Sequence, residues 1–212
     1  YVARRDALRK MIGSGIILLP GNCDSAINFP NNPIAFRQDS TFLYYFGLAN
    51  ARLAGIIDID NNSDTIYGDD VTIDEMVWTG TVPALSELAE GVGVKRTAPL
   101  AALPDAIAAA RREGRKIHYL PQFRGMVLIN MSTLLGVPVQ QVNDGISVDL
   151  MMAVTQMREI KSEEEIAEME RAFHVGYLMH TTAMSMCREG VVEREIIGAI
   201  GGIAMQHGWG CS

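Results

Sequence analysis

The stretch Phe36-Arg-Gln-Asp-Ser-Thr-Phe-Leu-Tyr-Tyr-Phe-Gly47 is the segment in which a dense aromatic run directly follows a cluster of polar side chains. Five of its residues are aromatic, although aromatic residues make up only 7% of the chain. Residues 42–46 are too short an apolar run for a helix, and their aromatic side chains suit a buried strand that Gly47 would end. We therefore predict a central β-strand at residues 42–46.

Arg37, Gln38 and Asp39 lie just ahead of this predicted strand. A guanidinium beside a carboxylate can pair with it, or with a carboxylate of a substrate or a neighbouring subunit, which a lysine does less well. Two interpretations therefore stay open: an ion pair at the start of a strand, which is the commoner case, and a binding site. Arg37 and Asp39 are candidate site residues on the second interpretation.

The composition limits the class of protein. The chain has 212 residues, of which 48% are hydrophobic and 20% charged, which is typical of one large or two modest globular domains. Its net charge of -7 argues against nucleic acid and against an anionic membrane as partners. Apolar runs are broken well before the roughly twenty residues that a membrane span needs. Cys23, Cys187 and Cys211 lack metal-binding spacing, so we expect reduced thiols in a cytoplasmic protein.

Strand and helix patterns alternate up to about residue 150. The expected strands are at residues 16–20, 42–46, 53–60, 64–67 and 116–120, and the expected helices at 2–12, 72–80, 83–90, 100–112 and 127–135. Residues 61–63 predict a hairpin turn, which makes part of the sheet antiparallel. This alternation predicts an α/β domain with a mixed β-sheet flanked by helices. No glycine pattern that cradles phosphate opens any of these helices, which argues against a nucleotide site.

The predicted hairpin also resembles a calcium-binding loop in one respect. Carboxylate and amide side chains occupy alternate positions, at Asp58, Asp60, Asn62 and Asp64. A calcium loop would have glycine where Ser63 stands and glutamate where Asp69 stands, and helices rather than strands would flank it. The calcium interpretation is therefore the weaker one.

Two further helices are expected after residue 157. The first carries one apolar stripe, formed by Ile166, Met169, Phe173, Tyr177, His180, Met184 and Cys187. We expect His180 and His207 to be hydrogen-bonded core residues. Two helices cannot bury such a stripe alone, so we expect another chain segment or a partner chain to cover it, and expect the sequence to be a fragment of a longer protein.

Four motifs together resemble one family. They are residues 36–47, Met157-Arg-Glu-Ile-Lys-Ser-Glu-Glu-Glu-Ile, His180-Thr-Thr-Ala-Met and Glu193-Arg-Glu-Ile. In this order they resemble the proline-specific metallopeptidases, and most of all bacterial Xaa-Pro aminopeptidases, with prolidase and creatinase as relatives. The resemblance implies a creatinase-like N-terminal domain over residues 1–156. Residues 157–212 would be the first, helical part of an incomplete pita-bread catalytic domain.

The resemblance also implies a reaction. Such enzymes remove the N-terminal residue ahead of proline with two divalent metal ions, commonly manganese, held by two Asp, one His and two Glu. None of these ligands maps onto this sequence, so we expect them beyond Ser212 and expect the chain alone to be inactive. Two alternatives remain: prolidase, which cleaves Xaa-Pro dipeptides, and a non-catalytic peptide-binding or oligomerisation module with the same fold.

The resemblance assigns a non-catalytic role to the N-terminal domain, which would form a homo-oligomer and wall the cleft that admits proline-containing peptides. Trp78, in Met76-Val-Trp-Thr-Gly80, matches a segment whose indole approaches a neighbour's active site in aminopeptidase P-type enzymes. The local pattern alone predicts a partly buried indole instead. Arg37 and Asp39 belong to a motif that is typical of the family, but the resemblance assigns no catalytic step to them. Trp78, Arg37 and Asp39 are thus the candidate substrate-cleft or subunit-contact residues.

Overall fold

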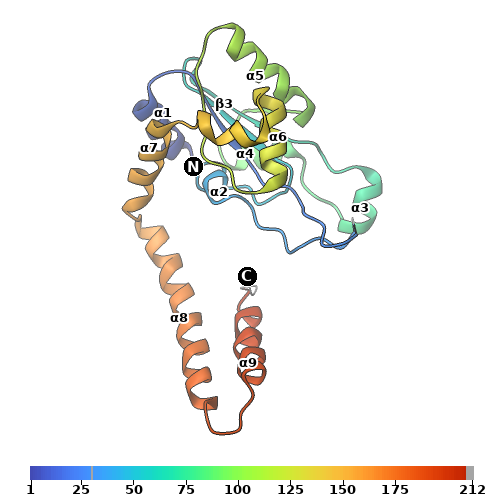
Figure 1. Ribbon diagram of the computed structural model, residues 1–212, viewed down its shortest axis with the longest axis vertical. Helices are drawn as coiled ribbons and strands as arrows, with labels where there is room; N and C mark the ends of the chain where they lie inside the picture. Colours follow the sequence, from blue (N-terminus) through green and yellow to red (C-terminus); the bar gives the residue numbers. More distant parts are fainter. Residues whose placement is uncertain (30, 209–212) are drawn as a thin grey trace. The chain divides into compact units, whose positions relative to one another are not determined.

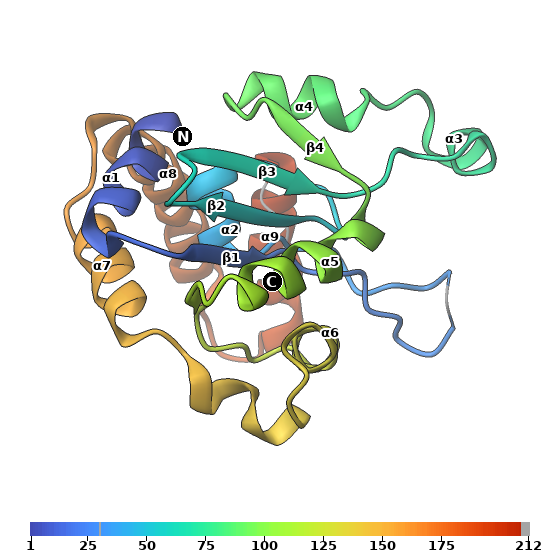
Figure 2. The ribbon, with the colours of Figure 1, turned by 90° about the horizontal axis from the view of Figure 1, so that it is seen from above.

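The computed structural model describes residues 1–29 and 31–208. The chain divides into two compact units, Tyr1–Gln156 and Met157–Ser212. Unit 1 is built on a mixed five-stranded sheet with the order β4-β3-β2-β1-β5 (Figures 1 and 2). The predicted fold class, a mixed sheet flanked by helices, is confirmed.

The sheet combines antiparallel and parallel pairs. The strands are β1 (Ile16–Pro20), β2 (Ala54–Asp58), β3 (Ser63–Tyr67), β4 (Arg96–Ala98) and β5 (Ile117–His118). β2 pairs antiparallel with both β1 and β3, so the hairpin expected across residues 61–63 is present. β4 pairs parallel with β3, and β5 parallel with β1.

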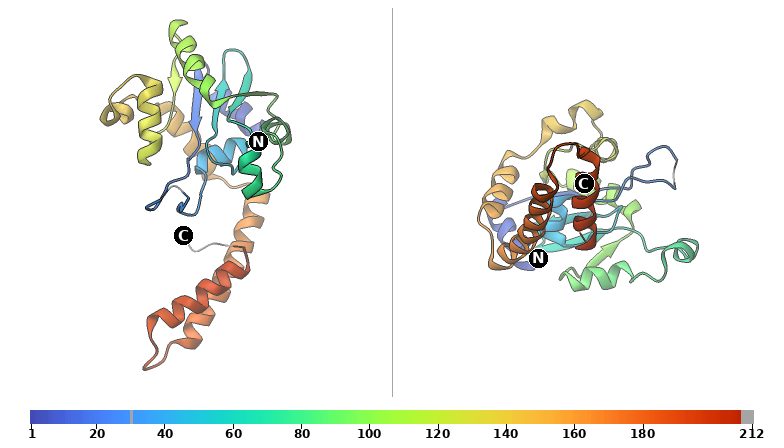
Figure 3. Two further views of the ribbon diagram at one scale, coloured as in Figure 1. Left: turned by 90° about the vertical axis from the view of Figure 1, so that its right-hand side faces the viewer. Right: turned by 90° about the horizontal axis from the view of Figure 1, so that it is seen from below.

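Helices cover both faces of the sheet. The helices up to residue 159 are α1 (Val2–Ile12), α2 (Ser40–Phe46), α3 (Ile73–Thr79), α4 (Leu85–Gly91), α5 (Leu103–Arg112), α6 (Gly125–Leu135) and α7 (Val148–Glu159), with 3-10 turns η1 (Leu100–Ala102) and η2 (Val139–Gly145). Ile16 and Leu18 of β1 belong to the core that α5, α6 and η2 complete. Successive strand residues face opposite sides, so Ile17 and Leu19 face the side on which α2 packs. Figures 2 and 3 show α2 and α6 on the two faces.

The strand predicted at residues 42–46 is wrong, because these residues form helix α2. Asp39 caps its first turn by accepting hydrogen bonds from the backbone N–H groups of Thr41 and Phe42, at 2.9 and 2.8 Å. Gly47 ends the helix in the left-handed conformation, with φ 69°. The buried aromatic residues lie at helical spacing, at Phe42, Tyr45 and Phe46. Gly55 of β2 leaves room for the Phe46 ring, since a Cβ atom at that position would lie 2.1 Å from it.

Among the described residues, no single helix is long and apolar enough to cross a membrane. α6 and η2 meet that standard of length and composition only as a pair, across a bend of 76°. Val127, Met131 and Val142 of this pair are buried in the core of unit 1.

Unit 2 contains two helices that pack against each other, α8 (Glu163–Met186) and α9 (Glu193–Gln206). The expected capping box at the start of α8 is present, between Ser162 and Glu165. Val175 and Ala204 are the buried residues of the two helices.

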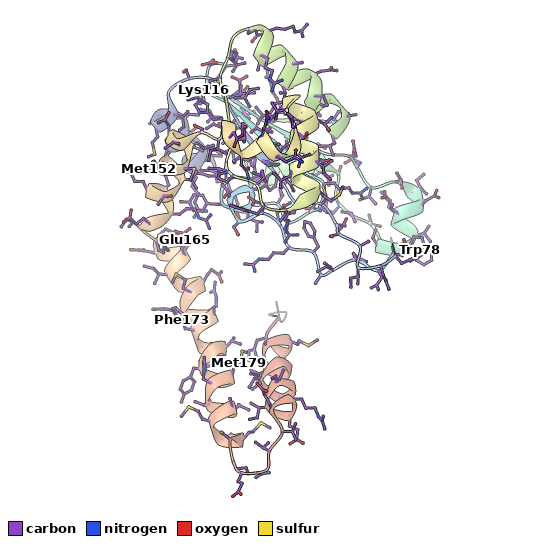
Figure 4. The ribbon with its side chains drawn as sticks, viewed as in Figure 1. Trp78, Lys116, Met152, Glu165, Phe173 and Met179 are labelled. Carbon is purple, nitrogen blue, oxygen red and sulfur yellow. The ribbon has the colours of Figure 1, made fainter. Side chains whose placement is uncertain are left out.

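The apolar stripe of α8 lies on the exposed side of this helix pair. Its exposed large side chains are Ile166, Met169, Phe173, Tyr177 and Met184, and Figure 4 labels Phe173. The expectation that His180 and His207 are core residues is wrong for this unit, because both are exposed. A two-helix unit offers only one interface, and these residues lie outside it. The His207 ring does form a hydrogen bond, from Nδ1 to the Ile203 carbonyl at 2.9 Å.

Candidate functional site

The polar cluster ahead of α2 is organised by Gln38, whose side chain is only 4% exposed. Its Oε1 accepts hydrogen bonds from the backbone N–H groups of Asn22 and Asp39, at 2.6 and 2.8 Å. Its Nε2 donates to the Asn50 carbonyl at 2.6 Å. One buried carboxamide therefore joins the loop after β1 to the loop before β2. The sequence analysis missed this role, although a buried amide needs partners for both its donor and its acceptor.

Arg37 and Asp39, the two charged candidates of this cluster, have separate surroundings. The Asp39 carboxylate is the N-cap of α2, and the Arg37 side chain is exposed. The Arg37 carbonyl accepts a hydrogen bond from Asn22 Nδ2 at 2.8 Å. Within residues 1–29 and 31–208, no ion pair joins Arg37 to Asp39. The first interpretation, an ion pair at the start of a strand, is therefore wrong, and a substrate-cleft role for either residue stays a prediction.

Trp78 lies on α3, a seven-residue helix with no buried residue. Its side chain is 89% exposed, and Figure 4 shows it on the helix that lies farthest out from the sheet in unit 1. The local pattern predicts a partly buried indole, and this prediction is wrong within this chain. The predicted capping box is present, between Thr72 and Glu75. Glu75 also pairs with Arg52, at 3.3 Å, across a largely exposed salt bridge.

The carboxylates of the hairpin already have cationic partners. Arg115 bonds to Asp58 and, through Nε at 2.6 Å, to Asp60. Arg5 Nε bonds to Asp64 at 2.7 Å, and Arg9 bonds to its other oxygen. These contacts tie the hairpin to α1 and to the turn before β5, which accounts for the alternating acids without calcium.

The pKa values of two hairpin acids reflect this pairing. Burial opposes ionisation of Asp58, but hydrogen bonds from Arg115 and Asn61 outweigh it and hold the pKa of that carboxyl below its usual value. The Gly15 backbone N–H and the Arg115 side chain lower the pKa of Asp60. Both groups are therefore ionised at neutral pH.

His118 is the buried histidine of unit 1. Its Nδ1 lies 2.8 Å from Ser147 Oγ, and its Nε2 lies 3.1 Å from the Ser14 carbonyl oxygen. A carbonyl can only accept, so Nε2 carries the proton and Nδ1 accepts from the Ser147 hydroxyl. Burial, assisted by Lys116, lowers the pKa of the His118 ring. A neutral ring held in this way supports β5 and the start of α7.

No group of three or more His, Cys, Asp or Glu side chains in the described ranges is arranged to hold a metal ion. Cys23 is half-buried and Cys187 exposed, both as free thiols, and Cys211 lies outside the described residues. The three candidate residues Trp78, Arg37 and Asp39 share no hydrogen bond or ion pair among the described contacts.

Comparison with known proteins gives one family. A sequence profile for "Aminopeptidase P, N-terminal domain" matches residues 1–118. Probable Xaa-Pro aminopeptidases of Neosartorya fischeri and Aspergillus clavatus are 24% and 26% identical over 195 residues, which cover 87% of this chain and 38% of each relative.

Solved structures agree on the fold. The low-pH form of aminopeptidase P from E. coli matches with a TM-score of 0.77 at 22% identity, covering 97% of this chain and 49% of that one. The structure of the same enzyme with the inhibitor Pro-Leu also matches with a TM-score of 0.77, and the match covers 48% of that chain. The chain therefore spans about half the length of the E. coli enzyme and less of the fungal relatives.

Proposed function

Because the chain belongs to the aminopeptidase P N-terminal domain family, we propose that it is the N-terminal portion of a metal-dependent Xaa-Pro aminopeptidase. The observation that carries the proposal is the family match over residues 1–118, which continues as distant homology to Xaa-Pro aminopeptidases over 87% of the chain. On this proposal, residues 157–212 are the first helices of the catalytic domain, and proline-containing peptides are the substrates.

The proposal assigns the chemistry to a segment outside this sequence. Two divalent ions, with manganese as the first candidate, would supply a hydroxide nucleophile and polarise the carbonyl ahead of proline. Their ligands would come from the additional length that the relatives have.

The proposed role of unit 1 is to wall the substrate cleft and to contact another subunit. Support comes from α3, which has seven residues and buries none of them. Isolated helices shorter than about 12–15 residues are marginal in water, so a contact with another subunit would stabilise this one. Its exposed apolar side chains, Ile73, Val77 and Trp78, are of the kind that subunit interfaces bury. We propose that Trp78 closes the cleft of a neighbouring subunit.

The first test compares two proteins: the 212-residue chain and the same chain extended to its natural C-terminus. With manganese, the extended protein should release the first residue of Xaa-Pro-Yaa peptides, whereas the 212-residue chain should not. Hydrolysis of Xaa-Pro dipeptides alone would identify a prolidase. An extended protein that binds such peptides without metal-dependent hydrolysis would be the non-catalytic module, and turnover by the 212-residue chain would contradict the proposal.

The second test concerns Trp78 in the extended protein. Trp78→Ala should lower kcat/KM by roughly 5- to 30-fold, the effect of removing an interface contact of about 1–2 kcal/mol. Phe123→Ala is the matched control, because Phe123 is equally exposed but does not lie on α3. Sedimentation velocity would report the subunit contact independently. Unchanged kcat/KM and unchanged sedimentation in Trp78→Ala would contradict the role given to α3.

A further inference from the structure

A cavity of about 270 Å³ lies where β1 ends, between the sheet and helices α5 and α6. Its walls are mostly apolar and include Leu53, Leu103, Met131 and Leu134. The first three of these are buried core residues, so the walls belong to the rigid part of unit 1. Apolar concavities with a few polar groups at the rim are the usual form of small-molecule sites.

Four polar side chains line the same cavity: Cys23, Arg52, Asn130 and Thr133. Asn130 Nδ2 lies 3.9 Å from Cys23 Sγ, so the loop after β1 and helix α6 meet here. Of the described residues that line the cavity, Arg52 is the only charged one. Burial and Asp24 raise the pKa of the Cys23 thiol, and the Arg52 charge acts against them.

The Arg52 side chain has capacity for a further partner. A guanidinium has five N–H donors. The hydrogen bond described for this one joins Nη2 to Glu75 at 3.3 Å, with both side chains largely exposed. Exposed pairs of this kind contribute little to stability, so a carboxylate entering at the rim can replace Glu75 at little cost.

The backbone of Arg52 is held in an unusual conformation. Its φ of 60° lies in the left-handed region, which non-glycine residues rarely adopt. The Arg52 N–H donates to the Asn22 carbonyl at 3.0 Å, and Gln38 clamps both Asn22 and Asn50. Backbone strain that the surroundings enforce in this way is concentrated at ligand-binding positions.

We propose that this cavity binds a small amphipathic carboxylate, with its apolar body between α5 and α6 and its carboxylate on Arg52. The apolar walls select an apolar body, and the single positive charge at the rim selects an anionic end. All residues that line the cavity belong to unit 1, and the proposal does not depend on the metal chemistry proposed above.

Binding is tested on the 212-residue chain with three probes that share an eight-carbon body: octanoate, 1-octanol and octylammonium, each below the concentration at which it aggregates. Titration calorimetry should give octanoate an affinity about tenfold above that of octanol, with octylammonium weakest. In Arg52→Gln, octanoate should fall to the affinity of octanol. Equal affinities of octanoate and octanol in the unaltered chain would overturn the assignment of the carboxylate to Arg52.

The position of binding is tested by filling the cavity. Asn130→Trp puts an indole at the mouth and should abolish octanoate binding. Ile129→Trp is the matched control, because Ile129 is half exposed on the same helix and does not line the cavity. Both positions accept a large side chain without disturbing the core, and thermal unfolding of the two variants would verify this. Retention of octanoate binding by Asn130→Trp would overturn the proposal.

Thiol alkylation gives a second readout that needs no variant. Octanoate should slow the alkylation of Cys23 by iodoacetamide at least fivefold. Cys187, an exposed thiol in unit 2, is the internal control and should react at the same rate with and without octanoate. Peptide mass spectrometry resolves the two sites. Equal rates at Cys23 with and without saturating octanoate would place the ligand elsewhere and refute the proposed site.

Discussion

Replacing Arg5 by methionine tests whether a buried guanidinium stabilises unit 1. The Arg5 side chain has no exposed surface. Its Nε donates to Asp64 Oδ2 at 2.7 Å, and its Nη1 to the Tyr45 carbonyl at 2.8 Å. Its Nη2 donates to the carbonyls of Val92 and Gly93, at 3.0 and 3.1 Å. One side chain on α1 thus joins β3, the end of α2 and the turn after α4.

The magnitude follows from the hydrogen bonds that methionine removes. Three carbonyls lose this donor, one in a buried hydrogen bond and two in partly buried ones, and an unsatisfied buried polar group costs about 1–3 kcal/mol. The Asp64 carboxylate keeps Arg9, and burial of the methionine side chain returns about 1–2 kcal/mol. The net loss expected in the free energy of unfolding is about 2–4 kcal/mol, because one carbonyl is buried, two are partly buried and Asp64 still has a cationic partner.

Urea unfolding of the 212-residue chain measures this change in the free energy of unfolding. Hydrogen exchange of peptides from residues 16–67 monitors the unfolding of unit 1. With a slope of about 2 kcal/mol/M, the midpoint should fall by about 1–2 M. Lys10→Met is the matched control on the same helix, since Lys10 is exposed, and it should stay within about 0.5 kcal/mol of the unaltered chain. A loss below about 1 kcal/mol in Arg5→Met would refute the reasoning from unsatisfied carbonyls.

Two further predictions concern other polar residues of unit 1. Burial lowers the pKa of His118, so the unfolded chain binds more protons below an unfolded-state pKa of about 6.5, and stability should fall as the pH drops through that value. In His118→Gln, the loss of unfolding free energy between about pH 7.5 and about pH 5.5 should be smaller than in the unaltered chain; an equal loss would locate the pH dependence elsewhere. Asp39→Ala removes the N-cap of α2 and should cost about 1 kcal/mol in the free energy of unfolding. Ser40→Ala is its control, and an equal effect of both changes would contradict the capping role.

Local signals predict much of the fold correctly. The hairpin of β2 and β3 follows from two β-rich runs around residues 61–63, and the two capping boxes follow from Thr72 with Glu75 and Ser162 with Glu165. Each of these signals lies within a few consecutive residues, so no knowledge of distant contacts is needed.

Helix α2 carries local signals of the same kind, although its aromatic composition favours a strand. Asp39 and Gly47 are an N-cap and a C-terminal glycine at the two ends of a run whose apolar residues are spaced three and four apart. The aromatic content of residues 42–46 favours a strand only where caps are absent. The caps are therefore the better guide for such a short run.

The sequence by itself determined the family, the mixed sheet with its hairpin, and most helix boundaries, because local pattern and motif order carry that information. Only the tertiary structure decided the partners of the polar residues: Asp64 with Arg5, which is 59 residues away, and Gln38 with Asn22 and Asn50. It also decided that Trp78 is exposed and that Arg52 lies at the rim of a cavity. Such contacts join segments distant in sequence, and burial selects them only after the sheet and helices have packed.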